Sequence, residues 1–158
     1  IEPLSVSKIV AKIVEIEKPG LILMGKQAID DDSNQTAQMT SALLNWPQAT
    51  FASKIEIEEN TAIVTREIDE GLERIKVKMP FVASCDLRLN EPRYASLPNI
   101  MKAKRKPLEE MDLESLGVSV EAKVSTLKVE SPPERKEGIK VETVDQLVDK
   151  LKNEAKII

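Results

Sequence analysis

The sequence contains no histidine and only one cysteine, Cys85, among its 158 residues. Without imidazole there is no histidine metal ligand, no histidine general base, and no Ser-His or Cys-His catalytic pair. A single thiol cannot close an internal disulfide or build a zinc site, so we expect a reducing compartment and an inert cysteine that fills space after the apolar residues 81–84. We therefore assign no catalytic residue and no metal ligand.

Long apolar runs are also missing, because the longest spans residues 21–25 and a membrane helix needs ~20. The chain has 27 acidic and 23 basic residues and a net charge of -4, so a dedicated nucleic-acid binder is disfavoured despite the basic residues 102–106. We expect neither nucleic acid as a partner nor direct membrane insertion. The first residue is Ile1, and we expect this chain to be part of a longer gene product.

The first third of the chain has the pattern of an α/β unit. Apolar residues at helical spacing predict a helix over 6–16 with Ser5 or Ser7 as N-cap. Residues 21–24 are apolar without alternation, which is typical of a strand buried in a parallel sheet. A polar loop follows, and then a helix over 37–46 with one apolar face formed by Met39, Ala42, Leu43 and Trp46. Too few parallel strands follow, so a missing N-terminal portion is expected.

From residue 50 onward the apolar period changes to two. Four strands are predicted, over 51–57, 61–67, 72–78 and 81–85, and the turn signals between them indicate an antiparallel meander. Further on we expect an ordered loop over 89–107 with a short helix at 99–104, a strand-like segment at 118–129 and a charged, proline-rich linker at 131–138. Thr143 is then expected to cap a helix whose stripe of Val144, Leu147, Val148 and Leu151 packs on a partner.

One polar segment lies where the buried strand is predicted to end and a helix to begin, which is where open α/β sheets bind ligands. Its glycine permits close backbone approach or a positive φ, and its last residues offer hydrogen-bond donors at a helix N-terminus, a ready anion site. A phosphate could sit there if the three aspartates point elsewhere. The alternative is a solvated loop in which Asp32, Ser33 or Asn34 merely caps the helix, since no Walker A or GxGxxG motif is present. The segment consists of Gly25, Lys26, Gln27, Ala28, Ile29, Asp30, Asp31, Asp32, Ser33, Asn34, Gln35 and Thr36.

Residues 93–106 place apolar side chains beside a basic cluster in a stretch too polar to be core. That arrangement is typical of a transient protein interface. A plain solvated loop and a nucleic-acid patch are the alternatives, the latter weakened because Tyr94 is the only aromatic nearby. Glu67 and Asp69 could form an acid/base pair, but their place around a predicted turn favours solvent-facing charges.

Four segments carry a family resemblance: 25–39 (GKQAIDDDSNQTAQM), 45–53 (NWPQATFAS), 65–73 (TREIDEGLE) and 86–104 (DLRLNEPRYASLPNIMKAK). Together they resemble the beta subunit of electron-transferring flavoprotein, of the mitochondrial and related bacterial type. The resemblance extends from about Pro3 to Ile158 and implies a chain that lacks the N-terminal portion of the subunit.

The resemblance implies a Rossmann-like, adenine nucleotide alpha hydrolase-like α/β partial domain over 1–130, including a recognition loop at 86–108. Residues 131–158 are implied to be a linker and a helix that packs on an alpha subunit. The family's beta subunit is a non-enzymatic carrier component that shares FAD held mainly by the alpha subunit and binds a structural AMP, here through residues 25–36. It accepts electrons from acyl-CoA and other dehydrogenases and passes them to a ubiquinone oxidoreductase, in the mitochondrial matrix or the bacterial cytoplasm.

By the same resemblance, Leu97 inserts into an apolar pocket of the dehydrogenase, Glu67 contacts the mobile flavin domain, and Lys102 is methylated in some members. The other implied partner-binding residues are Tyr94, Pro98, Ile100 and Met101. This sequence departs from the family pattern at Ala37, Asn45, Glu70 and Arg105, and Arg105 puts a second methylation site in doubt. The rival interpretation is a free-standing regulatory module that binds an adenine nucleotide.

Overall fold

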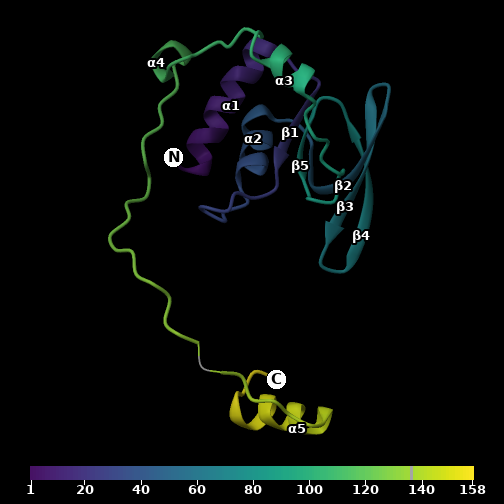
Figure 1. Ribbon diagram of the computed structural model, residues 1–158, viewed down its shortest axis with the longest axis vertical. Coiled ribbons are helices and arrows are strands. Elements are labelled where there is room, and N and C mark those ends of the chain that lie inside the picture. The colour runs from purple at the N-terminus through teal and green to yellow at the C-terminus, as the bar shows by residue number, and fades with distance from the viewer. Residues whose placement is uncertain (136) are drawn as a thin grey trace. The chain divides into compact units, whose positions relative to one another are not determined.

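The computed structural model describes residues 1–135 and 137–158, which form two compact units, Ile1–Val124 and Ser125–Ile158 (Figure 1). Lys136, in the predicted linker, lies outside the described residues. The first unit contains α1 (Pro3–Glu17), β1 (Leu21–Gly25), α2 (Thr36–Leu44), β2 (Gln48–Glu58), β3 (Thr61–Ile68), β4 (Gly71–Lys78), β5 (Phe81–Cys85), α3 (Leu97–Ala103) and α4 (Leu113–Leu116). The second contains α5 (Val144–Asp149) and the π-helical turn η1 (Lys150–Glu154).

The five strands form one sheet in the order β1-β5-β2-β3-β4. Strands β1, β5 and β2 run parallel to one another, and β3 and β4 continue the sheet in antiparallel pairing. A parallel part flanked by helices is the Rossmann-like element, and the mixed α/β class is confirmed. The hairpin turns at 59–60 and 69–71 are also confirmed, because β2 pairs with β3 and β3 pairs with β4.

The prediction that residues 81–85 close an antiparallel meander is wrong. Strand β5 instead inserts between β1 and β2 and pairs in parallel with both. Phe81, Val82, Ala83 and Ser84 are all buried, because a central strand has both faces covered. The uninterrupted small and apolar side chains of this segment were a signal for a central parallel strand.

Both predicted N-terminal helices form, but their packing differs from the prediction. Glu2, not a serine, is the N-cap of α1, and Ser5 and Ser7 are buried within the helix. The Ser7 hydroxyl donates to the Pro3 and Thr36 carbonyls at 2.8 and 3.0 Å, which fixes the start of α2 against α1. Helix α2 packs against α1, β5 and β2, and its buried residues are Ala37, Thr40 and Ser41. On the predicted apolar face, Ala42 and Leu43 are exposed, and Met39 and Trp46 are half-buried.

The core lies under β2, β3 and β5. Phe81 and Val64 are its largest fully buried apolar side chains, surrounded by alanines on β2, β3 and β5. Strand β1 pairs with β5 on one side only, and its Leu23 is 55% exposed. The expectation that β1 is apolar on two buried faces is therefore wrong for this chain.

The predicted strand at 118–129 does not form among the described residues. Lys123 and Val124 of this segment lie beside the start of α1, where Glu2 Oε1 accepts from both of their N–H groups, at 2.7 and 2.8 Å. A side chain, rather than a neighbouring strand, satisfies these backbone donors.

In the second unit, Thr143 caps α5 as predicted, because its hydroxyl accepts from the Gln146 N–H at 3.2 Å. The side chains of Val144, Leu147 and Val148 are exposed on this helix. None of the described helices has the length and apolar character that crossing a membrane requires.

Candidate functional site

The carboxyl ends of β1 and β5 bring two distant segments together. Gly25 pairs with Cys85 in the parallel register, and the Lys26 N–H donates to the Cys85 carbonyl at 3.1 Å. The polar loop 26–35 and the segment that begins at Asp86 therefore leave the sheet side by side. This confirms that the loop follows the carboxyl end of a parallel strand, where ligands bind in open α/β folds.

Within the loop, two of the three aspartates are engaged locally. Asp31 accepts from the Ser33 N–H at 3.1 Å, and Asp32 accepts from the Gln27 amide. Asp32 and Asn34 both adopt positive φ, at 53° and 51°, a conformation that these residue types tolerate better than most. The loop is thus held in a defined shape by its own polar side chains.

Helix α2 begins at this loop, and none of the three predicted caps is used. Gln35 is the N-cap, and its side chain makes no capping hydrogen bond to any described residue. The alternative interpretation, in which Asp32, Ser33 or Asn34 caps the helix, is therefore wrong. A nine-residue helix whose first N–H groups lack a side-chain cap offers donors and a positive dipole end to an anion.

Gly25 does not have a positive φ, so its conformation is one that any residue adopts. A Cβ placed on it would meet no atom within 4 Å. It lines two adjoining hollows of about 390 and 250 Å³, which share Gly25, Lys26, Gln27 and Ala28. What the glycine supplies is open space against the backbone.

Asp86 is a buried charge that sequence reasoning did not single out. It is 3% exposed, and one of its oxygens accepts from Lys26 Nζ at 2.7 Å. The other accepts from the backbone N–H and the Nε of Arg88, both at 3.0 Å. Its position in the sequence could have indicated this ion pair, because Lys26 and Asp86 are the first residues after two strands that end at the same edge of the sheet.

The Lys26 ammonium, followed by the Arg88 N–H and guanidinium, holds the pKa of Asp86 well below its ordinary value of 3.8. Lys26 also lies over the Phe51 ring, 6.0 Å from its centroid. Phe51 has a φ of 57° at the bulge where β2 leaves β5, and its N–H donates to the Ser84 hydroxyl at 2.8 Å. The lysine is thus fixed by a carboxylate on one side and a ring on the other.

A depressed carboxylate pKa sets the direction of a pH effect. The ionised Asp86 stabilises the folded state above the ordinary carboxyl pKa, and this contribution is lost as the pH falls through the lower folded-state value. Asp86→Asn is expected to lower the free energy of unfolding at neutral pH. The difference from wild type should persist down to about pH 4 and shrink below it.

Denaturant unfolding at several pH values measures this difference, with Glu70→Gln in the exposed β3–β4 turn as the control. If the free energies of unfolding of wild type and Asp86→Asn differ by the same amount at all pH values, the stabilising role of the ionised Asp86 is contradicted.

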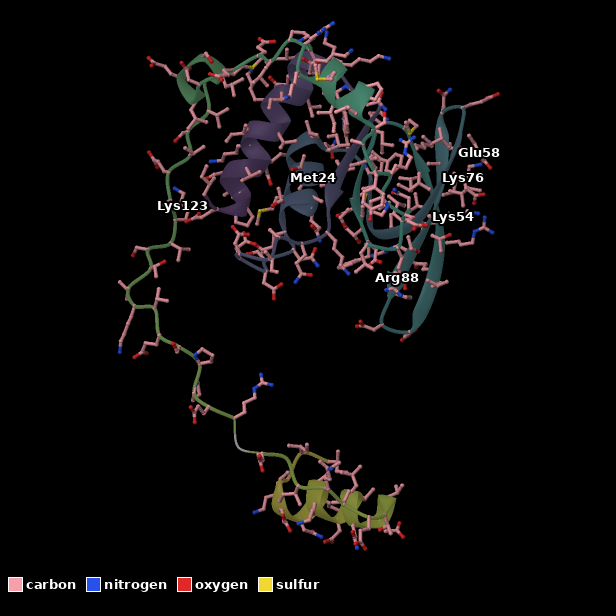
Figure 2. All side chains as sticks on the ribbon, in the orientation of Figure 1. Met24, Lys54, Glu58, Lys76, Arg88 and Lys123 are labelled. Atoms are coloured by element: carbon pink, nitrogen blue, oxygen red, sulfur yellow. The ribbon has the colours of Figure 1, made fainter. Side chains whose placement is uncertain are left out.

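Glu67 and Asp69 line a third hollow of about 480 Å³, whose wall also includes Lys26, Asp86 and Arg88. Glu67 Oε2 lies 3.5 Å from an outer guanidinium nitrogen of Arg88. The interpretation of both residues as free hairpin charges holds for the exposed Asp69, whereas Glu67 is partly buried in an ion pair. Figure 2 shows Arg88 toward the β3–β4 turn, apart from Lys54, Glu58 and Lys76 farther along the hairpin.

The segment around Leu97 is exposed throughout. Leu97 begins α3 and is 72% exposed, and Ile100 and Met101 present further apolar surface on the same short helix. Tyr94 is fully exposed before the helix, Pro98 lies in its first turn, and Lys102 lies in its last. In Figure 1, α3 lies at the opposite end of the unit from the loop between β1 and α2. The exposed apolar side chains of α3 and the polar loop therefore belong to separate surfaces.

Cys85 is partly buried at the end of β5, and burial raises the pKa of its thiol. A thiol with a raised pKa is a poor nucleophile at neutral pH. The expectation of an inert side chain agrees with this environment.

Comparison with known proteins places these surfaces in a family. A family profile described as "Electron transfer flavoprotein domain" matches residues 1–116. The chain belongs to the electron transfer flavoprotein family. Strands β1 to β5 and the loop 26–35 all fall within the matched region, as do Leu97 and α3.

Curated relatives match over nearly the whole chain. The electron transfer flavoprotein subunit beta of Bradyrhizobium diazoefficiens is 59% identical over 158 residues, covering 100% of this chain and 64% of the relative. The mitochondrial subunit beta of Arabidopsis thaliana is 55% identical over 158 residues (99% and 63%). The electron transfer flavoprotein subunit beta of Homo sapiens is 55% identical over 155 residues (98% and 61%). The chain thus spans less than two thirds of the length of these relatives.

Proposed function

We propose that this chain is part of the beta subunit of a heterodimeric electron-transfer flavoprotein, a carrier and not an enzyme. The family match over residues 1–116 carries the proposal. FAD, held mainly by an alpha subunit, supplies the redox chemistry. This chain helps to position the flavin and docks the electron donors. Electrons come from acyl-CoA and other dehydrogenases and go to a membrane-bound ubiquinone oxidoreductase.

The loop from Gly25 to Thr36 is proposed to hold a structural AMP. Three features fit a nucleotide: the open space over Gly25, the uncapped start of α2 within the described residues, and the engagement of Asp31 and Asp32 within the loop. The open space admits a ligand against the backbone, and the uncapped helix start attracts a phosphate. The hydrogen bonds of the two aspartates within the loop reduce their repulsion of that phosphate. Further contacts are expected from parts of the full-length subunit outside this chain.

Leu97 is proposed as the anchor that inserts into an apolar pocket of the partner dehydrogenase. It is exposed on a helix followed by Lys102, Lys104, Arg105 and Lys106, so an apolar centre is bordered by positive charge. Buried anchors with polar rims are how transient interfaces combine affinity with reversibility. Lys102 is the proposed methylation site.

Two further contacts are proposed with the alpha subunit. Glu67, at the edge of the sheet's antiparallel part, contacts the mobile flavin domain, and the exposed stripe of α5 packs on the alpha subunit. The whole assembly is expected in the mitochondrial matrix, or in the cytoplasm if the source is bacterial.

Purification of the full-length subunit tests the assignment. We expect it to copurify with an FAD-bearing second chain. Denaturation of the complex should release AMP, which mass spectrometry detects. A stable single chain that binds AMP or ATP exchangeably, without a flavin partner, would support the rival regulatory module. Absence of any adenine nucleotide would refute the proposed role of the loop.

A further inference from the structure

One buried carboxylate joins the polar loop to Glu67. Lys26, the first residue after β1, and Arg88, two residues beyond Asp86, both bind the Asp86 carboxylate at 2.7 and 3.0 Å. Arg88 then reaches Glu67 on β3 at 3.5 Å. The four side chains form a continuous row of alternating charge from β1 across the sheet edge to β3.

Asp86 is the rigid member of this row. Its own N–H donates to the Ala52 carbonyl at 2.9 Å, and the preceding Cys85 pairs with Gly25 and Ala52 in neighbouring strands. Arg88 is the exposed member, because its side chain is 62% exposed. Its guanidinium is a planar fork, so the bond from Nε to Asp86 restricts where its outer nitrogen can meet Glu67.

We propose that Asp86 is a positioning residue that holds Glu67, through Arg88, in the orientation in which Glu67 contacts the flavin domain. The inference rests on the proposed function, because it takes Glu67 as the group that makes this contact. Arg88 lines the hollow beside Glu67 and does not line the two hollows around Gly25. Its loss is therefore expected to leave bound AMP unchanged.

The test uses full-length beta subunit in complex with its alpha subunit and follows dehydrogenase-dependent flavin reduction. Because the Arg88–Glu67 pair is exposed, Arg88→Met should lower kcat by about two- to fivefold. Arg88→Lys, which keeps the charge near Glu67, should restore part of the loss. The KM for the dehydrogenase should not change, because α3 lies at the other end of the unit (Figure 1).

A double-mutant cycle separates positioning from general destabilisation. Asp86 and Glu67 are linked through Arg88, so Asp86→Asn and Glu67→Gln should each lower kcat, and the loss in Asp86→Asn should not exceed the loss of about two- to fivefold expected for Arg88→Met. The double variant should be no slower than the slower single variant, to within about twofold. A purely structural role of Asp86 predicts instead that the two losses multiply.

Lys76→Met is the matched control, because Lys76 also makes an exposed ion pair, with Glu58 at 3.3 Å, on the hairpin away from Arg88 (Figure 2). It should leave kcat unchanged. If Glu67→Gln lowers kcat while Asp86→Asn and Arg88→Met do not, or if the losses multiply, the positioning role is overturned. If Glu67→Gln itself has no effect, the proposed contact of Glu67 with the flavin domain fails, and the positioning role fails with it.

Discussion

Leu97→Ala is expected to slow electron uptake from the dehydrogenase strongly while leaving the flavin and AMP content of the complex unchanged. Leu97 is 72% exposed at the start of α3, so the fold does not depend on its side chain. Truncating an anchor that becomes buried at an interface costs ~2 kcal/mol or more, which is roughly a 30-fold loss in kcat/KM. Steady-state reduction by the partner dehydrogenase measures the change.

Ile57→Ala provides the matched control for this anchor. Ile57 is 59% exposed on β2, outside α3, and pairs with Ala62 at the other end of β3 from Glu67, so the truncation removes similar exposed apolar surface elsewhere. It should not alter the reduction rate. Equal losses for both variants, or an unaltered rate for Leu97→Ala, would contradict the docking role of Leu97.

Gly25→Val is expected to weaken AMP binding by about tenfold or more without unfolding the subunit. The Cβ at this position enters empty space, and valine suits the end of a strand, so the thermal midpoint should change little. The added methyl groups occupy the space that the ligand needs against the backbone. We expect the AMP content of the purified complex to fall by about tenfold or more, and a tenfold loss of affinity corresponds to about 1.4 kcal/mol.

Gly20→Val tests the specificity of this effect at the opposite end of the same strand. Its Cβ would meet only the terminal methyl of Met79, at 3.5 Å, which is ordinary contact. AMP content should stay at the wild-type level in that variant. Retention of AMP in Gly25→Val, measured after denaturation by mass spectrometry, would place the nucleotide elsewhere.

The two predictions address opposite ends of the first unit, and this separation was not visible in the sequence. Residues 25–36 and residues 93–106 are both polar segments next to short apolar runs. Only the path of the chain from Asp86 to α3 shows that they form independent surfaces (Figure 1). Independent surfaces should give independent losses, so Leu97→Ala and Gly25→Val are expected to affect different measurements.

Local patterns predicted most elements because their causes are local. Alternation predicted β2 to β4, Thr143 was recognised as a cap, and the helical period predicted α1 and α2. The predictions that were wrong concern which residues pack against other elements. Ser5 and Ser7 have the right chemistry for caps, but the helix begins before them and buries both. The face of α2 that packs is small and partly polar, because it lies close to the sheet.

The sequence alone determined that this chain has no histidine chemistry, no internal disulfide and a polar segment after an apolar strand, since each follows from residue identity and order. Tertiary structure decided that β5 lies between β1 and β2, because strand order depends on pairing between distant segments. That insertion brings Asp86 beside Lys26, 60 residues apart in the chain, and buries a charge that looks ordinary in the sequence. Burial and long-range pairing, which no local pattern encodes, create the row that reaches Glu67.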